Sequence, residues 1–378
     1  MRRTSAFFLA MLCLAFAGTA AAQSTGHLVY IGTYTGEKSQ GIYAYRFDPA
    51  TGSFTPLGLA AETRNPSFLA LHPNGRVLYA VNEVSDFDDQ KSGSVSAFAI
   101  DRETGKLTLL NTRSSRGGSP CYIVVDKDGK HVLVANYSGG NLAVLPIGPD
   151  GSLGEATQVV QHTGSGPNER RQRRPHAHSV DLDAASAFAI SADLGADRLF
   201  VYRYDAGTLT PASVPSVAAE PGAGPRHFAF HPGGRFGFAA NELSSTLTAY
   251  AWDAARGELR TLASVSTLPA GFSGDNYPGT VIVHPGGRFV YLSNRGHDSI
   301  AVFEVNAGTG AVTPVQHESV RGRWPRHFNI HPGGEWLVAA GQRSDSVAAF
   351  RIDRNTGRLF PVGDPIEVGS PSCVLFVP

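Results

Sequence analysis

Short apolar runs separated by turn residues follow one another along nearly the whole chain. The first two cover residues 28–34 (LVYIGTY) and 41–47 (GIYAYRF), and both are rich in β-branched and aromatic residues. Runs of this length between turns containing glycine and proline predict β-strands. After the N-terminal segment, no run reaches the roughly 20 apolar residues that a membrane-spanning helix needs. The pattern therefore predicts many short strands joined by tight turns.

The strands belong to a unit that repeats about every 50 residues. One copy begins at Asn65-Pro66-Ser67, turns at His72-Pro73-Asn74-Gly75 and ends at Asn82-Glu83. Seven prolines mark the start of the copies: Pro66, Pro120, Pro175, Pro225, Pro278, Pro325 and Pro371. They are 54, 55, 50, 53, 47 and 46 residues apart. This period, with only strand-like runs between turns, is typical of four-stranded propeller blades.

A second marker gives the same number of repeats. A polar residue followed by a glycine turn recurs at Asp48, Asp101, Asp150, Asp205, Asp253, Asn306 and Asp353. Asp and Asn bond their own backbone two residues on, and glycine supplies the left-handed conformation, so we expect hairpins between the two outer strands of each blade. Calcium loops would need more carboxylates than these turns carry.

The two ends of the chain complement each other. The first blade begins without its innermost strand, and the chain ends with that strand alone, at residues 373–377. Pairing the two would close the ring and remove two exposed sheet edges. We therefore expect residues 23–378 to form one all-β domain, a seven-bladed β-propeller of four-stranded antiparallel blades.

Residues 1–22 have the pattern of a signal peptide. Arg2 and Arg3 precede an apolar stretch over residues 6–18, and Ala20-Ala21-Ala22 fits a small-residue cleavage site. The alternative is an uncleaved anchor, but the stretch is short for a membrane span. We expect an exported, periplasmic protein that has no membrane attachment after cleavage and begins at Gln23.

Charge and cysteine content narrow the possible partners. The 32 basic residues balance the 32 acidic ones, whereas proteins that neutralise phosphates are usually basic, so we expect no nucleic-acid partner. Outside the signal peptide, Cys121 and Cys373 lie in non-adjacent repeats. Two cysteines make no disulfide framework, and we expect two buried free thiols. Nothing in the sequence defines an oligomeric state.

Strand order predicts which polar residues share one mouth of the propeller channel. The innermost strand of a blade begins beside the end of the second strand, so Pro-Arg-His and Asn-Glu or Asn-Arg motifs meet at one mouth. The His-Pro-x-Gly turns, with His72, His231, His284 and His331, lie at the other, and their repetition favours a structural role. The non-repeating polar residues at the first mouth are Arg174, His176, His178, Arg226, His227, Glu242, Asn294, Arg295, Arg326 and His327.

These residues form a candidate anion-binding and acid–base site, and the alternative is a ring of salt bridges between blades. A long loop over residues 164–174 carries four arginines; it could cover the mouth and hold an anion, or be solvated. His176 and His178 share a strand face, as metal ligands can, but the surrounding arginines would repel a cation. We expect no metal and no other cofactor.

Several motifs, in order along the whole mature chain, resemble those of the seven-bladed propeller lactonases. They are Tyr30–Thr35, His176–Ser179, Asp193–Asp197, Gly224–His227 and Ser293–Ile300. That family includes bacterial propeller 6-phosphogluconolactonase and the fungal carboxy-muconate lactonising enzyme. The resemblance implies a metal-independent site with His178, Arg226, Glu242 and Arg295 as catalytic residues. We assign substrate binding to His176, His227, Asn294 and Arg326.

The resemblance predicts hydrolysis of a small anionic or sugar lactone. Glu242 or His178 would act as the general base, and Arg226 and Arg295 would stabilise the oxyanion. Export argues against a phosphorylated substrate, because phosphogluconolactone belongs to cytoplasmic metabolism. Two alternatives stay open. One is the lactonising reaction of a carboxy-muconate, and the other is a propeller that binds a protein and has no enzymatic activity.

Overall fold

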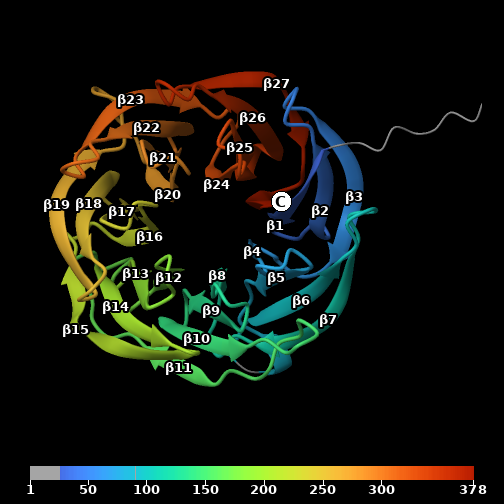
Figure 1. The fold of residues 1–378 in the computed structure, drawn as a ribbon, viewed down its shortest axis with the longest axis horizontal. Coiled ribbons are helices and arrows are strands. Elements are labelled where there is room, and N and C mark those ends of the chain that lie inside the picture. The colour runs from blue at the N-terminus through green and yellow to red at the C-terminus, as the bar shows by residue number, and fades with distance from the viewer. Residues whose placement is uncertain (1–25, 90) are drawn as a thin grey trace, which may run out of the picture.

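A computed structural model describes residues 26–89 and 91–378 (Figure 1). The predicted signal peptide, residues 1–22, lies outside this range. The described residues form seven four-stranded antiparallel sheets, arranged in a ring (Figure 1). The predicted seven-bladed propeller is thereby confirmed. Within the same range, no helix is long and apolar enough to cross a membrane.

The blades are numbered here along the chain, and the strands of each are given from the ring axis outward. Blade 1 contains β28 (Pro371–Val377), β1 (His27–Thr33), β2 (Gly41–Phe47) and β3 (Phe54–Glu62). Blade 2 contains β4 (Phe68–Leu71), β5 (Val77–Asn82), β6 (Ser94–Ile100) and β7 (Leu107–Ser114). Blade 3 contains β8 (Pro120–Val125), β9 (His131–Asn136), β10 (Asn141–Pro146) and β11 (Gln158–Gln161). Blade 4 contains β12 (Ala177–Leu182), β13 (Phe188–Asp193), β14 (Arg198–Asp205) and β15 (Thr208–Ala218).

The remaining blades follow the same order. Blade 5 contains β16 (Pro225–Phe230), β17 (Phe236–Asn241), β18 (Thr246–Asp253) and β19 (Glu258–Ser266). Blade 6 contains β20 (Tyr277–Val283), β21 (Phe289–Arg295), β22 (Ser299–Val305) and β23 (Val312–Ser319). Blade 7 contains β24 (Pro325–Ile330), β25 (Trp336–Gly341), β26 (Ser346–Ile352) and β27 (Leu359–Glu367). Two short 3₁₀ turns, η1 (Phe87–Asp89) and η2 (Gln342–Ser344), follow β5 and β25.

The hydrophobic core lies between neighbouring blades. Side chains alternate along a strand, so each sheet presents one apolar face to the blade before it and one to the blade after it. The resulting clusters each join two blades; one of them packs Val134 of blade 3 against Tyr79 of blade 2. The buried Tyr79 hydroxyl donates to the Gly151 carbonyl of blade 3, and Tyr291 makes the same contact with Gly357. Burial of apolar surface thus holds the blades together in sequence order.

Blade 1 closes the ring as predicted. The strand β28 pairs with β1 along its length, with Leu28 opposite Val377 and Gly32 opposite Cys373. Cys373 is therefore in blade 1, whereas Cys121 is in blade 3, and blade 2 separates them. Both are buried free thiols, as expected.

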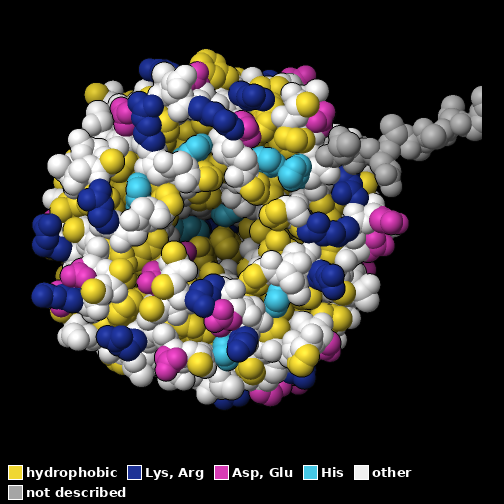
Figure 2. Space-filling model, in the orientation of Figure 1, with side chains coloured by type: hydrophobic (Ala, Val, Ile, Leu, Met, Phe, Trp, Pro, Cys, Tyr) yellow, Lys and Arg dark blue, Asp and Glu magenta, His cyan; other side chains and the backbone are white. Residues whose placement is uncertain are grey.

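The ring has two unlike ends. We call one end the site rim: there the innermost strand of each blade begins and the second strand ends. At the turn rim, the opposite end, each innermost strand turns into the second. In Figure 2 the centre of the ring is hollowed, and histidine side chains lie spaced around it.

β-bulges recur where the innermost strands begin at the site rim. In blade 5, Pro225 pairs with Asn241 and His227 pairs with Ala240, so Arg226 is the extra, unpaired residue. The corresponding extra residues in blades 3, 4 and 7 are Cys121, His178 and Arg326. A bulge redirects the side chain of its extra residue. Three of these side chains, those of Cys121, His178 and Arg326, line the cavity described below.

Candidate functional site

A cavity of about 190 Å³ lies at the site rim. Its walls come from all seven blades and from the 164–174 loop. The residues that line it are Tyr34, Glu83, Cys121, Tyr137, Arg171, His178, Glu242, Arg295 and Arg326. Three of the four residues predicted to be catalytic are among them.

Two repeating backbone positions supply all but one of these side chains. Cys121, His178 and Arg326 are the bulge residues described above. The others stand at the end of the second strand, where Glu83 and Glu242 directly follow β5 and β17. Tyr34, Tyr137 and Arg295 occupy the same position in their blades. Only Arg171 comes from a connecting loop.

Glu242 is surrounded by arginines. Its Oε1 accepts a hydrogen bond from Arg171 at 2.6 Å, and its Oε2 accepts one from Arg295 at 2.6 Å. The Nε atom of Arg226 lies 3.2 Å from Oε2. Burial opposes ionisation, but Arg295 and Arg226 outweigh it and hold the pKa of Glu242 far below its ordinary value. Glu242 is therefore a permanent negative charge and a weak base.

Backbone carbonyls fix two of the three arginines. Arg226 donates to the Gly279 carbonyl at 2.7 Å and to His227 Nε2 at 3.0 Å. Arg295 donates to the Tyr277 and Pro278 carbonyls at 2.9 and 3.1 Å. Arg295 reaches the cavity, whereas Arg226 lies behind Glu242 and does not line it. The geometry thus gives Arg226 a positioning role rather than direct contact with a bound molecule.

His178 is the imidazole at the cavity wall. Burial and the nearby Arg226 lower its pKa well below the ordinary range, so the ring is neutral at neutral pH and can accept a proton. Its Nδ1 lies 3.6 Å from the Cys121 thiol, and Tyr137 packs edge-on against its ring at 5.4 Å. Burial raises the pKa of Cys121, which is therefore a thiol and not a nucleophilic thiolate.

A second charged group forms another part of the wall. Tyr34 donates from its hydroxyl to Glu83 Oε2 at 2.6 Å, and Arg326 approaches the same oxygen at 3.6 Å. The Arg326 guanidinium also lies over the Tyr34 ring, 5.1 Å from its centre. Four guanidinium groups stand in or directly behind the wall with two carboxylates, counting Arg226. The excess of positive charge favours an anionic or oxygen-rich ligand.

Three residues predicted to bind substrate do not line the cavity. His176 stacks on Tyr137 at 4.4 Å and bonds the Tyr137 carbonyl, so it supports the wall from outside. His227 is buried behind the wall against Arg226. Asn294 is fully buried and donates to the Thr267 carbonyl at 2.7 Å. Of the four residues to which we assigned substrate binding, only Arg326 reaches the cavity.

The repeat explains where Asn294 lies. An asparagine occupies the end of the second strand in several blades, and its side chain ties that strand to a neighbouring connection. Asn82 donates to the Arg64 carbonyl at 2.6 Å, and Asn136 donates to the Ser115 carbonyl at 2.9 Å. Asn294 makes the same kind of contact and belongs to this structural set. The residue after each of them faces the cavity.

That register could have identified residues that the sequence reasoning missed. Glu83 and Tyr137 follow Asn82 and Asn136 just as Glu242 follows Asn241. Aligning the repeats at these asparagines selects them both. The contribution of Cys121 has no such signal, because it depends on a bulge that the residue spacing does not reveal. Of the four arginines in the 164–174 loop, Arg171 reaches Glu242, and the other three, Arg170, Arg173 and Arg174, are exposed.

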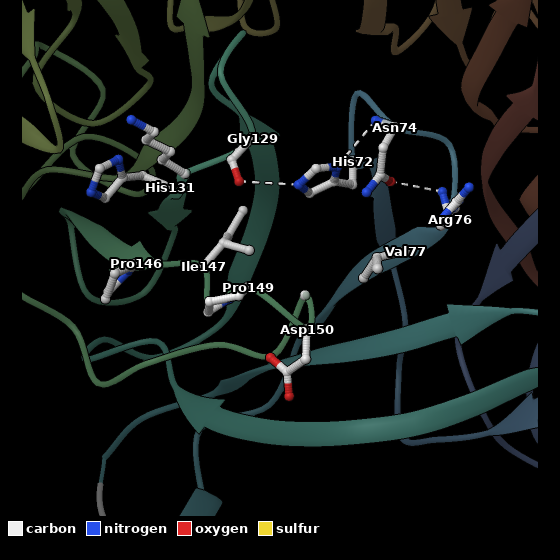
Figure 3. Close-up of a pocket in the computed structure, with 13 residues that line it drawn as sticks. His72, Asn74, Arg76, Val77, Gly129, His131, Pro146, Ile147, Pro149 and Asp150 are labelled. Atoms are coloured by element: carbon white, nitrogen blue, oxygen red, sulfur yellow. Dashed lines mark hydrogen bonds between the residues drawn. The ribbon is translucent and has the colours of Figure 1, made fainter.

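A larger cavity, of about 670 Å³, lies at the turn rim between blades 2 and 3 (Figure 3). Its histidines are already engaged. His72 bonds the Gly129 carbonyl at 3.0 Å, as Figure 3 shows, and His131 bonds Asp126 at 3.0 Å. The acid–base groups are therefore concentrated at the site rim, despite the smaller volume there. Among the described residues, no group of three or more His, Cys, Asp or Glu side chains is placed to hold a metal ion.

Comparison with known proteins agrees with this fold. The family described as "Lactonase, 7-bladed beta-propeller" matches residues 28–376. The chain is 40% identical over 304 residues to a 6-phosphogluconolactonase of Bacillus subtilis strain 168, covering 80% of this chain and 85% of that protein. It is 34% identical over 307 residues to a 6-phosphogluconolactonase of Formosa agariphila, covering 79% and 85%.

A solved structure is also similar. The periplasmic gluconolactonase of Pseudomonas aeruginosa superimposes with a TM-score of 0.87 and 36% sequence identity, covering 93% of this chain and 99% of that one. The match of the family over nearly the whole described chain agrees with the resemblance that the sequence motifs indicated. The chain therefore belongs to the seven-bladed β-propeller lactonase family.

Proposed function

We propose that this chain hydrolyses a sugar lactone to the open-chain hydroxy acid in the site-rim cavity. The observation that carries the proposal is the neutral imidazole of His178, which faces the same small cavity as three guanidinium groups and the ionised Glu242. A base and preorganised cationic donors are what ester hydrolysis requires. The names of the two similar 6-phosphogluconolactonases and of the gluconolactonase support a sugar-acid lactone.

In the proposed mechanism, His178 takes a proton from water as the water oxygen attacks the lactone carbonyl. Arg295 and Arg326 donate to the oxygen that becomes negative. The carbonyl carbon then releases the ring oxygen, which receives the proton from His178 as it leaves. His178 ends neutral, and one water has been added across one C–O bond. Glu242 offsets the charge of the transient imidazolium, and Arg226 holds Glu242 in place.

Glu242 was the other candidate for the base. Both of its oxygens accept guanidinium hydrogen bonds, and its pKa is strongly lowered, so it is the weaker proton acceptor in this geometry. The side-chain atom within hydrogen-bonding range of the His178 ring is instead the thiol of Cys121, 3.6 Å from Nδ1, and not a guanidinium group. We therefore assign the proton transfers to His178 and the charge balance to Glu242.

Turnover measurements with purified protein test the function. The substrates are glucono-lactone, its 6-phosphate and a carboxy-muconate. We expect acid release from at least one sugar lactone, with a loss of about 10²–10⁴-fold in His178→Gln. His231→Gln, at the turn rim, is the matched control and keeps full activity. No turnover of any lactone would overturn the proposal and favour a non-enzymatic binding role.

The lactonising reaction is the second candidate, because the arginines around the cavity could bind a substrate with several carboxylates. Closure of a carboxy-muconate to a lactone, without hydrolysis of sugar lactones, would establish it. The assignment of the base has its own test: if Glu242→Gln abolishes turnover while His178→Gln retains it, Glu242 is the base.

We also propose that the chain acts in the periplasm without a metal or other cofactor. The pattern of residues 1–22 supports export, and the similar Pseudomonas aeruginosa protein is described as periplasmic. N-terminal sequencing of the secreted form should begin at Gln23. Activity should survive treatment with a metal chelator, and loss of activity restored by a divalent metal would contradict the proposal.

A further inference from the structure

Arg171 stands between two cavities. On one side is the catalytic cavity at the site rim. On the other is a groove of about 580 Å³, which we call the outer groove. It is lined by Asn168, Arg170, Arg171, Leu243, Ser244, Ser245, Leu268, Gly274, Asp275, Asn276 and Tyr277. Arg171 is the residue that the two linings share.

The two cavities are also joined through Glu242. Leu243, Ser244 and Ser245 directly follow it in the connection between β17 and β18, and all three line the outer groove. The groove therefore begins within a few residues of the catalytic carboxylate. A six-carbon lactone whose carbonyl lies beside His178 would direct its far end toward this boundary or toward the opposite wall.

The size of the catalytic cavity favours an extended substrate site. Ligand pockets usually enclose roughly 300–1,000 Å³, and the catalytic cavity alone, at about 190 Å³, is smaller. Adding the outer groove brings the combined space into that range. A substrate larger than the reacting ring would thus occupy both.

Arg171 is held differently from the two arginines beside it. Arg226 and Arg295 donate to backbone carbonyls and are almost fully buried. The Arg171 side chain is 35% exposed, and its hydrogen bonds go to two side chains, Glu242 at 2.6 Å and the Tyr137 hydroxyl at 3.2 Å. Both contacts are at the end of a long, flexible side chain, so the guanidinium can exchange a partner without moving the backbone.

The backbone under Arg171 is well anchored. The neighbouring Gln172 is fully buried, donates to the Leu194 carbonyl at 2.9 Å and accepts from the Asn168 amide at 3.0 Å. Asn168 in turn accepts from the backbone amide of Arg171 at 3.1 Å. These contacts fix the point from which the side chain projects. Reorientation of Arg171 is consequently confined to the guanidinium end.

The chemistry of the outer groove suits an anion. Arg170 and Arg171 supply positive charge, Ser244 and Ser245 supply hydroxyls, and Asp275 is the one carboxylate in the lining. Arginine binds phosphate and carboxylate groups through two parallel hydrogen bonds. An anionic group in the groove would therefore compete with Glu242 for the Arg171 guanidinium.

We propose that the outer groove is the subsite for an anionic group at the end of the substrate far from the lactone carbonyl, and that Arg171 is its specificity-determining residue. The group is a phosphate or a carboxylate on the last carbon of the sugar. The inference rests on the proposed lactone hydrolysis, which it extends to one class of lactones. Arg171 turns from Glu242 toward that group when the substrate binds.

The experiment compares three lactones that differ at the sixth carbon: glucono-lactone, its 6-phosphate and glucaro-lactone, which carries a carboxylate there. We expect the wild-type protein to prefer at least one anionic lactone. In Arg171→Gln, KM for that lactone should rise about 10- to 100-fold, as expected for the loss of a charge-assisted pair, and the loss of kcat/KM on glucono-lactone should be clearly smaller, because that lactone carries no anionic group at the sixth carbon. If the wild-type protein prefers the 6-phosphate, the group is a phosphate; if it prefers glucaro-lactone, the group is a carboxylate.

Two further variants separate recognition from folding. Arg173→Gln is the matched control, because Arg173 is exposed on the same loop and lines neither cavity. It should keep the wild-type preference. Arg171→Lys keeps the charge but loses the paired hydrogen bonds, and it should retain part of the preference.

Three results would overturn the inference. Equal losses on all three lactones in Arg171→Gln would reduce Arg171 to a structural partner of Glu242. Unchanged kinetics in that variant would remove it from the site. Wild-type hydrolysis of glucono-lactone that equals or exceeds both anionic lactones would reject the anionic subsite while the proposed hydrolysis stands. Failure of the wild type on every lactone would instead reject both.

Discussion

Both ends of the propeller carry histidines, but the two sets do different work. At the turn rim, the Nδ1 atoms of His72, His231 and His284 accept the amide two residues on. Their Nε2 atoms donate to glycine carbonyls of the next blade, at 3.0, 2.7 and 2.9 Å. Figure 2 shows histidines spaced around the central hollow. At the site rim, His178, His227 and His327 are buried near arginines and share no such repeated contact.

The difference shows how to interpret a repeat protein. A side chain that recurs with the same partner in successive blades holds the blades together, as the turn-rim histidines and the asparagines at the ends of the second strands do. A side chain that differs between blades at an equivalent position is free to serve chemistry. Glu83, Tyr137, Glu242 and Arg295 occupy one such position, and each is placed by the same backbone geometry.

After the loss of His178, the next largest effect should come from Arg295→Lys at the site rim. Lysine keeps the charge beside Glu242 but loses the bonds to the Tyr277 and Pro278 carbonyls that aim the group. We expect kcat/KM to fall about 10²–10³-fold, the usual loss for one oxyanion donor. Steady-state kinetics on the preferred lactone measure it. A change smaller than threefold would remove Arg295 from the transition state.

Acid should destabilise the fold through the site-rim histidines. Burial and Arg226 lower the pKa of His178 and His227 well below the ordinary range, and that of His327 to about 3. Unfolded histidines bind protons below about pH 6.5 and these folded ones do not, so their stabilisation is present above that pH and lost below it. Together the three histidines lower the free energy of unfolding by about 6 kcal/mol between pH 8 and pH 5.

Asp181 opposes this trend. Burial raises the pKa of Asp181 to about 7, so on acidification its folded carboxylate binds a proton at a higher pH than the unfolded one does. This difference raises the free energy of unfolding by about 3 kcal/mol over the same pH range. The expected net loss is about 3 kcal/mol. Urea unfolding at pH 8 and pH 5 measures it, and Asp181→Asn should raise the loss to about 6 kcal/mol. Equal stability at both pH values in that variant would contradict the assignment.

At the turn rim, His284→Phe should reduce stability and leave kcat unchanged. It removes the bond to the Gly334 carbonyl and the acceptor for the Gly286 amide, and we expect a loss of about 1–2 kcal/mol in the free energy of unfolding. Denaturant titration and kinetics are measured on the same sample. A fall in kcat with normal stability would erase the distinction between the two rims.

The smallest effect should come from His331→Phe, although His331 has the same place in its blade as His284. Blade 1 follows it, and the two inner strands of that blade, β28 and β1, are joined by pairing and not by a turn. In the described chain, the buried Nε2 of His331 accordingly has no hydrogen-bond partner. We expect a cost about 1 kcal/mol below that of His284→Phe. Equal costs would show that the inter-blade bond contributes nothing.

The repeat made the fold predictable, and part of the site with it. Evenly spaced prolines and two complementary chain ends were enough for seven blades and a closed ring. Strand order correctly brought His178, Glu242, Arg295 and Arg326 to one cavity. What spacing could not supply is register. One extra residue at each bulge decides whether a side chain lines the cavity or lies behind it.

Arg226 and Arg171 illustrate the limit from opposite directions. Arg226 was expected to meet the substrate and instead lies behind Glu242, because its bulge directs it toward the Gly279 carbonyl of the next blade. Arg171 was one of four arginines in a loop, and its position depends on the burial of Gln172. Neither outcome follows from residue type or from distance along the chain.

Ring closure has a consequence for how the protein matures. Among the described strands, the innermost strand of blade 1, β28, is synthesised after all the others, whereas its partner β1 is synthesised first. Until β28 arrives, β1 keeps an unpaired edge, and Tyr34 at its end lacks the finished blade that aims it into the cavity. The cavity is therefore complete only once β28 has paired with β1. Folding of the site thus depends on a contact between two segments that lie more than 300 residues apart, such as Leu28 with Val377.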